Sequence, residues 1–247
     1  MLRIGGQRAR LAVLVPSTNT VVEAEYQALA PPGVTVHTGR MPVPAPSVAS
    51  DDDTTRLLAD VRRGVPGALR SVLDCRPDRV LLGMSAPTFY GGTDGARAYE
   101  SEVAALAGVP VTAGSTACTR ALRALGARRI AVLSPYRPVN DTEVRRYFTE
   151  AGFTLTGLRS LLCTSATQIA EVGEEDIVPV VEELAATAPD AIVQVGTNLW
   201  FAGLAAELER RLALPVVAIN TATLWTALRE HGITDRVEGA GRLLAEH

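Results

Sequence analysis

Hydroxyl and amide side chains follow two apolar runs of this sequence, and their types suggest a site for an anion. Ser85 and Thr88 come after the first run, and Thr197 and Asn198 come after the second. With neighbouring backbone N–H groups, such side chains can cradle a carboxylate or an oxyanion without a cationic residue. Thr and Asn at strand ends also act as plain turn formers. Because the pattern recurs after several apolar runs, we favour the carboxylate cradle.

The apolar runs themselves are typical of buried parallel strands. Residues 80–82 are continuously apolar, residues 191–195 are apolar apart from Gln194, and both stretches lead into glycine-containing loops. In an open α/β sheet, ligands bind beyond the carboxyl ends of the strands. Met84 and Gly196 lie nearly half the chain apart at similar points of the two stretches. We therefore expect two similar lobes that face one site.

Strands and helices are expected to alternate along the chain, which predicts parallel sheets with crossover helices. Expected strands cover residues 10–15, 34–38, 80–82, 109–112, 129–133, 154–161, 191–195 and 215–219. Expected helices cover residues 21–29, 51–73, 96–106, 115–125, 140–151, 176–187, 202–212 and 221–231. The proline-rich segment 41–46 should form a surface or lid loop. The first lobe is expected over residues 1–116 plus the C-terminal part 221–247, and the second over 117–220.

Composition excludes several classes of function. The chain has 247 residues, is 47% hydrophobic and carries a net charge of −3, so it can bury a core but offers no basic surface for nucleic acid. No apolar run approaches the roughly 20 residues of a membrane span, and the first eight residues lack a signal-peptide core. We expect a cytoplasmic protein with no nucleic-acid or membrane partner. Assembly into a homo-oligomer is left open.

Several kinds of chemistry are also disfavoured by the motifs. The three cysteines, Cys75, Cys118 and Cys163, have no metal-ligand spacing, so disulfides and metal sites are not expected. The glycines at 91–95 lack the lysine of a phosphate-binding loop, and no serine lies in a nucleophile elbow. The acidic triplet 51–53 reads better as a helix start than as a metal site.

Several segments taken in order resemble the aspartate/glutamate racemase superfamily, in its maleate isomerase and arylmalonate decarboxylase branch. The segments that carry the resemblance are residues 15–23, 36–41, Phe89-Tyr90 with Gly92, Pro135-Tyr136, 209–212 and 215–217. The resemblance covers nearly the whole chain. It implies two flavodoxin-like, Rossmann-like parallel-sheet lobes related by pseudo-twofold symmetry, with the site between them and no metal or organic cofactor.

The same resemblance makes the absence of two cysteines the central feature of the sequence. The family's chemistry normally uses one cysteine in each lobe, and the decarboxylase keeps only the second. Those positions fall at Met84 and Gly196 here. Because neither residue can attack an alkene or deliver a proton, the usual cysteine mechanisms are in doubt.

What the resemblance retains is the carboxylate cradle. It implies catalytic roles for Tyr136 and Ser85, and a wider set of substrate-binding residues: Pro16, Asn19, Ser85, Ala86, Tyr136, Cys163, Ala166, Ile169, Thr197 and Asn198. Ala86 stands where the decarboxylase has a hydroxyl, which removes one donor. The expected function is a cofactor-independent lyase or isomerase acting on a small carboxylic or dicarboxylic acid by a route without cysteine. The alternative is a non-catalytic protein that binds a carboxylate or serves a regulatory role.

Overall fold

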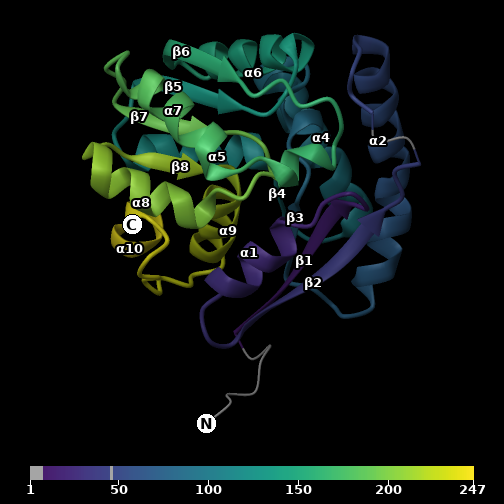
Figure 1. Ribbon diagram of the computed structural model, residues 1–247. Coiled ribbons are helices and arrows are strands. Elements are labelled where there is room, and N and C mark those ends of the chain that lie inside the picture. Colours follow the sequence, from purple (N-terminus) through teal and green to yellow (C-terminus); the bar gives the residue numbers. More distant parts are fainter. Residues whose placement is uncertain (1–7, 45–46) are drawn as a thin grey trace.

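The computed structural model describes residues 8–44 and 47–247, and it contains two four-stranded sheets (Figure 1). The first eight residues, considered above as the chain's start, lie almost wholly outside this part, as do residues 45 and 46 of the proline-rich segment. The strands of the first sheet are β1 (Ala9–Pro16), β2 (Val34–Met41), β3 (Arg79–Leu82) and β4 (Val111–Thr112). Those of the second are β5 (Arg129–Ser134), β6 (Thr154–Ser160), β7 (Ala191–Gln194) and β8 (Val216–Ala218).

Both sheets are parallel and share one strand order. The first runs β2-β1-β3-β4 and the second runs β6-β5-β7-β8, so each strand has a counterpart four strands later. Such an order places a switch point between the first and third strands of each sheet, where parallel α/β sheets bind ligands. The expected α/β fold with two parallel sheets is confirmed.

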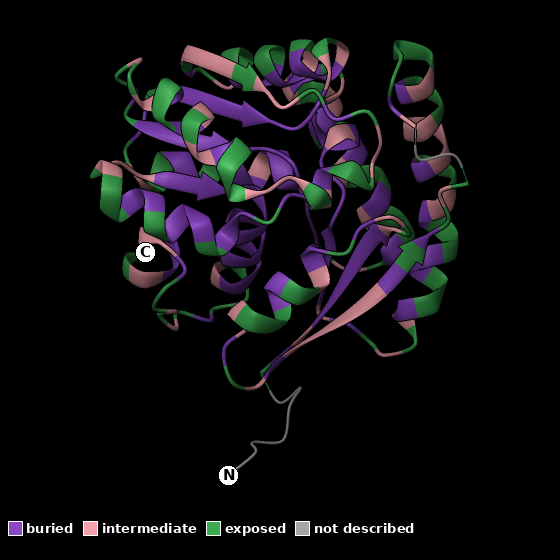
Figure 2. Ribbon diagram, viewed as in Figure 1, coloured by how far each residue is buried: buried purple, intermediate pink, exposed green. Residues whose placement is uncertain are grey.

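Helices connect and cover the strands, as parallel pairing requires. They are α1 (Val22–Leu29), α2 (Asp51–Leu73), α3 (Ala86–Phe89), α4 (Gly92–Ala107), α5 (Gly114–Ala124), α6 (Pro138–Glu150), α7 (Glu174–Ala185), α8 (Ala202–Leu212), α9 (Ile219–Glu230) and α10 (Arg242–Glu246), with a 3-10 turn η1 (Gln168–Glu171). In Figure 2 the strands are mostly buried and the outward faces of the helices are exposed. No helix in the described residues combines the length and apolarity needed to cross a bilayer.

Helix α2 shows how the sequence fixes its local start. Ser50 caps it by accepting a hydrogen bond from Asp53 N at 3.1 Å, and three aspartates occupy its first turn, where the helix dipole favours negative charge. The acidic triplet is therefore a helix start, as expected. The buried residues of α2 recur every three or four positions, including Val61, Val65 and Leu69, so one face packs inward.

Two local differences separate the structure from the sequence-based expectations. Met41 is the last residue of β2 and is fully buried, so the surface or lid loop begins only after it. Beyond that loop, Val48 N donates to Thr164 O at 2.9 Å, which links the first half of the chain to the second. The loop after β3 contains the one-turn helix α3, whose first turn includes Pro87.

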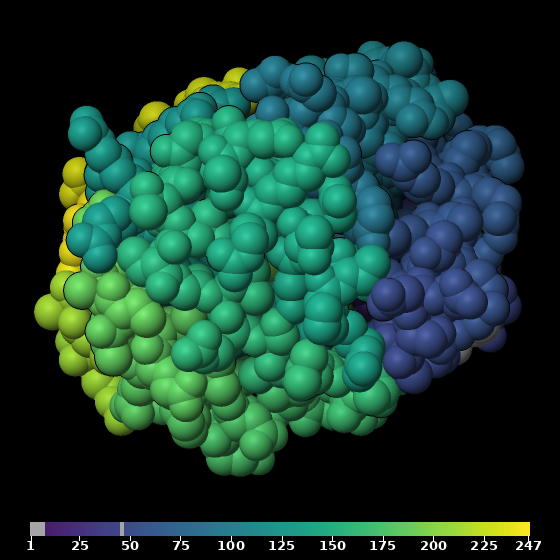
Figure 3. Space-filling view, turned by 90° about the horizontal axis from the view of Figure 1, so that it is seen from above, coloured from purple at the N-terminus to yellow at the C-terminus, as the bar shows by residue number. Residues whose placement is uncertain are grey.

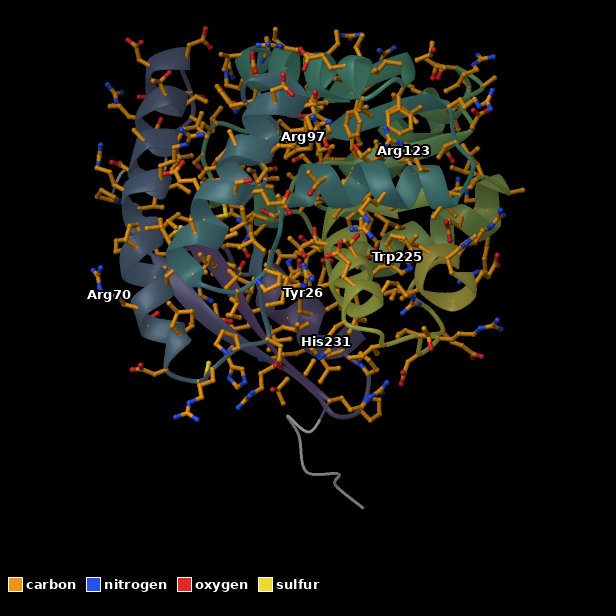
Figure 4. All side chains as sticks on the ribbon, turned by 180° about the vertical axis from the view of Figure 1, so that it is seen from behind. Tyr26, Arg70, Arg97, Arg123, Trp225 and His231 are labelled. Atoms are coloured by element: carbon orange, nitrogen blue, oxygen red, sulfur yellow. The ribbon has the colours of Figure 1, made fainter. Side chains whose placement is uncertain are left out.

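Helix α9 lies between the two sheets. It contacts α1, β3 and β4 of the first half as well as α5 and β8, and all residues from Ile219 to Leu228 are buried. Figure 4 shows Tyr26 of α1 beside α9, which carries Trp225. The predicted lobe boundary at residues 116 and 117 falls inside α5. We propose that the lobes meet through α5 and α9, which pack against each other.

Candidate functional site

A cavity of about 80 Å³ lies where the loops after several strands converge. Its lining residues come from both halves of the chain: Pro16, Thr18, Asn19, Leu57, Leu58, Val61, Met84, Ser85, Ala86, Pro87, Tyr136, Ala166, Ile169, Gly196, Thr197 and Asn198. Figure 3 shows a narrow furrow between the purple and blue first part of the chain and the teal and green second part. The structure thus brings together most of the residues expected at a site between two lobes.

Ser85, Tyr136 and Thr197 form a hydrogen-bonded chain at this cavity. They follow β3, β5 and β7, so the carboxyl ends of three strands bring them together. Thr197 N donates to Ser85 Oγ at 3.3 Å, and Ser85 Oγ is hydrogen-bonded to Tyr136 Oη. Tyr136 Oη in turn donates to Val195 O at 3.2 Å. Because the proton of Tyr136 Oη points to Val195 O, Ser85 Oγ donates to Tyr136 Oη. These two hydroxyl groups can rotate and donate to a bound anion when it is the better acceptor.

Tyr136 is suited to donate a hydrogen bond and not to remove a proton. Burial raises the pKa of its phenol well above the ordinary value, and the hydrogen bond with Ser85 offsets only part of that rise. The phenol is therefore neutral near pH 7 and keeps its proton. A neutral phenol beside a buried hydroxyl can stabilise negative charge that develops on a ligand oxygen.

Asn19 presents a second donor. Its Oδ1 accepts from Val21 N and Val22 N at 3.0 Å each, which caps the start of α1. Its Nδ2 is buried and has no hydrogen-bond partner in the described chain. An unpaired buried donor is costly, and Asn19 lines the cavity, so its Nδ2 is a candidate contact for a ligand oxygen.

Asn198 lines the cavity, but its side chain is already engaged by the protein. Its Oδ1 accepts from Thr20 N at 3.0 Å, and its Nδ2 donates to Ala166 O at 2.8 Å and to Thr18 O at 3.3 Å. These bonds join the loop after β1 to loops of the second half. A carboxylate would therefore meet the backbone of Asn198 more readily than its amide group.

The rest of the wall is apolar. Pro16, Ala86, Ala166 and Ile169 line it as expected, and Met84, only 2% exposed, lines it beside Ser85. Five further residues of the cavity wall were not predicted from the sequence: Leu57, Leu58 and Val61 of α2, together with Thr18 and Pro87. The apolar periodicity of α2 showed that one face is buried, but it could not show that part of this face borders a ligand cavity.

A second cavity, of about 40 Å³, adjoins the first and shares much of its wall. The shared residues are Leu57, Leu58, Ala86, Tyr136, Ala166 and Ile169, and the added ones are Val48, Thr54, Pro135, Arg137 and Asn140. Among the described residues that line either cavity, Arg137 is the one cation. A ligand held by Tyr136 can extend an apolar group into this second space.

No thiol lines either cavity within the described residues. Cys163, expected at the site, is 2% exposed and packs in the core behind it, where its N–H donates to Pro135 O at 3.1 Å. Burial raises the pKa of its thiol, and burial likewise raises the pKa of Cys118. Both buried thiols are thus held in their unreactive, protonated form.

Gly196 is restricted by a neighbouring ring. It is not among the glycines with positive φ. A Cβ added there would lie 2.8 Å from Pro135 Cδ and closer still to Pro135 Cγ. Crowding by Pro135, and not backbone conformation, is therefore the physical reason for glycine at this position.

A metal centre is not indicated by the described residues, which contain no group of three or more His, Cys, Asp or Glu side chains placed to hold an ion. The donors at the cavity are hydroxyl, amide and backbone N–H groups. These groups bind anions such as carboxylates and are poor ligands for a transition metal.

Comparisons with known proteins point to one family. A family model described as arylmalonate decarboxylase matches residues 78–244. The chain is 32% identical over 170 residues to an arylmalonate decarboxylase of Bordetella bronchiseptica, covering 67% of this chain and 70% of that protein. It is 29% identical over 251 residues to a maleate isomerase of Nocardia farcinica, covering 96% of each.

A solved structure is similar over almost the entire chain. It is the Nocardia farcinica maleate cis-trans isomerase, in a cysteine-to-serine mutant with a covalently bound succinylcysteine intermediate. The TM-score is 0.88 at 26% identity, and the match covers 97% of this chain and 99% of that one.

Proposed function

Because the chain belongs to the arylmalonate decarboxylase family, we propose that it is a cofactor-independent enzyme acting on a small carboxylic or dicarboxylic acid. The observation that carries it is the series of hydrogen bonds from Thr197 to Tyr136 through Ser85, at a cavity also lined by Asn19, whose buried Nδ2 has no partner among the described residues. These groups suit a carboxylate whose negative charge increases during reaction.

The two usual cysteine positions are, in this proposal, occupied by Met84 and Gly196. Both residues line the cavity, and both lie next to the residues of the hydrogen-bonded chain, Ser85 and Thr197. The related isomerase carries a covalent adduct on a cysteine. Since no thiol from the described part of the chain lines the cavity, the proposed reaction proceeds without a cysteine adduct.

Decarboxylation of a malonate shows how these groups would act. The bond between the α-carbon and the departing carboxylate breaks, and its electron pair moves into the remaining carboxylate as an enediolate. Tyr136 and Asn19 would hold the enediolate oxygens. The α-carbon then takes the hydroxyl proton of Ser85, and a water molecule protonates the resulting alkoxide and becomes hydroxide. The apolar second cavity would receive the substituent on the α-carbon.

The proposal is tested by incubating the protein with maleate, substituted malonates, aspartate and hydantoins in deuterium oxide and following proton NMR. Deuterium at the α-carbon, loss of carbon dioxide or isomerisation would demonstrate catalysis. Binding of one of these acids by calorimetry without any turnover would favour the non-catalytic alternative, which the lack of a thiol at the cavity supports. If the protein neither binds nor converts any of these acids, the enzymatic proposal and the non-catalytic alternative are both contradicted.

Replacing Tyr136 with phenylalanine should weaken carboxylate binding or turnover by about 1 to 3 kcal/mol, because it removes one donor and keeps the ring. The unfolding free energy should fall by about 1 kcal/mol, since Val195 O loses its donor. Calorimetry and thermal unfolding measure the two effects. Unchanged affinity and activity would show that Tyr136 Oη does not contact the ligand.

A further inference from the structure

Glu25 is a buried carboxylate of α1 that is not part of the cavity wall. It is 7% exposed, and its Oε1 accepts from Phe201 N at 3.1 Å and from Ala202 N at 2.9 Å. These two N–H groups begin α8, where the positive end of the helix dipole favours an anion. Through these two hydrogen bonds, Glu25 joins α1 to α8 of the second half. Figure 1 shows that α1 also lies beside α9.

Asn220 extends this connection to the site. Its Nδ2 donates to Glu25 Oε2 at 2.7 Å and also to Thr197 O at 3.0 Å. Thr197 is the residue whose N–H donates to Ser85 Oγ. The carboxylate of Glu25 is therefore two hydrogen bonds away from the loop that borders the ligand cavity.

The bond to Thr197 O fixes the orientation of a peptide plane. In a trans peptide the carbonyl and the following N–H point in opposite directions. With Thr197 O held toward Asn220, the N–H of Asn198 must point away from Asn220. Among the described residues this N–H has no acceptor, and Asn198 lines the cavity.

We propose that Glu25 and Asn220 are positioning residues that hold the peptide between Thr197 and Asn198 so that its N–H faces a carboxylate in the cavity. That the N–H of Asn198 binds a carboxylate rests on the proposed function, whereas that Glu25 and Asn220 hold the peptide does not. Burial raises the pKa of Glu25, and its three hydrogen-bond donors offset only part of that rise.

Glu25→Gln tests this inference because a glutamine cannot accept on both sides. Its NH2 group must face either the N–H groups of α8 or Asn220 Nδ2, and both are donors. The matched control is Glu209→Gln. Glu209 is also buried, at 5% exposure, and accepts from Val216 N and Arg242 N, but it lines neither cavity.

Two measurements separate positioning from general stability. Amide hydrogen exchange of the ligand-free protein should be about tenfold faster for Thr197 and Leu199 in Glu25→Gln, and unchanged in Glu209→Gln. The dissociation constant for phenylmalonate, measured by calorimetry, should rise about tenfold in Glu25→Gln and stay unchanged in Glu209→Gln. Asn220→Ala serves as a second variant and should give the same two changes.

Equal exchange at Thr197 and Leu199 in wild type and in a folded Glu25→Gln or Asn220→Ala variant would overturn the inference. So would faster exchange with an unchanged phenylmalonate affinity. If the wild-type protein binds no carboxylate, the proposed function fails, and the exchange data alone still decide whether Glu25 holds the loop.

Discussion

The Ser85→Ala variant is expected to lose about 10²- to 10³-fold in kcat/KM toward whichever acid the NMR screen identifies as substrate. Ser85 Oγ is the only link between Thr197 N and Tyr136 Oη among the hydrogen bonds of the described residues, so its removal disconnects these two donors of the second half and takes away the hydroxyl that the first half supplies. The hydroxyl is also the group proposed to deliver a proton to the α-carbon. Stability should fall by only about 1 kcal/mol, because one buried hydrogen-bonded hydroxyl is lost.

Ser115→Ala is the matched control for that experiment. Ser115 is fully buried and donates to Thr88 O at 2.6 Å, but it does not line the cavity. It should lose similar stability and retain kcat/KM. Initial rates and denaturant unfolding of the two variants provide the comparison. If Ser85→Ala has the same kcat/KM as Ser115→Ala, Ser85 has no part in the proposed mechanism.

Introducing a thiol at Gly196 is expected to produce the second large effect, a gain of arylmalonate decarboxylation. A cysteine there would place a proton donor next to Thr197, and a positioned general acid contributes about 10²- to 10⁴-fold. The single Gly196→Cys variant should be destabilised by about 1 to 3 kcal/mol, because its Cβ would collide with the ring of Pro135. Combining it with Pro135→Ala removes that ring and should recover part of the stability.

The new thiol can be examined independently of turnover. In the Pro135→Ala/Gly196→Cys variant, alkylation by iodoacetamide should be slowed by phenylmalonate. Gly203→Cys provides the control, since Gly203 is exposed on α8 and a Cβ there meets no other atom within 4 Å. Its thiol should react with no protection by phenylmalonate. A folded double variant whose thiol is inert, or reacts at the same rate with and without ligand, would place the second-lobe site elsewhere.

The parts of the site that follow directly from strands could be predicted from the sequence. Ser85 and Thr197 each come after an apolar run and lie at the carboxyl end of a strand, where parallel α/β sheets bind ligands. The two strands belong to different sheets, and the similar placing of the two runs in the two halves of the sequence led us to expect that their ends face one site. The alternation of strands and helices likewise predicted the two parallel sheets.

Other features depended on contacts between distant segments, which local patterns do not specify. Leu57 and Val61 were recognisable as an apolar helix face, but their position at the cavity depends on how α2 packs. Glu25 appears in the sequence as one more acidic residue of an amphipathic helix, and it is buried because the start of α8 supplies its donors. The crowding at Gly196 comes from Pro135, a residue of another strand's loop.

The position of α9 has a consequence for how the protein is made. The strands of the first sheet are complete by residue 112, yet α9, which covers part of that sheet, spans Ile219–Glu230. During synthesis from the N-terminus, the first half therefore has an apolar face exposed to solvent until α9 has left the ribosome. A nascent chain halted before residue 219 should be captured by chaperones and cut readily by proteases, whereas one extended past residue 230 should resist both.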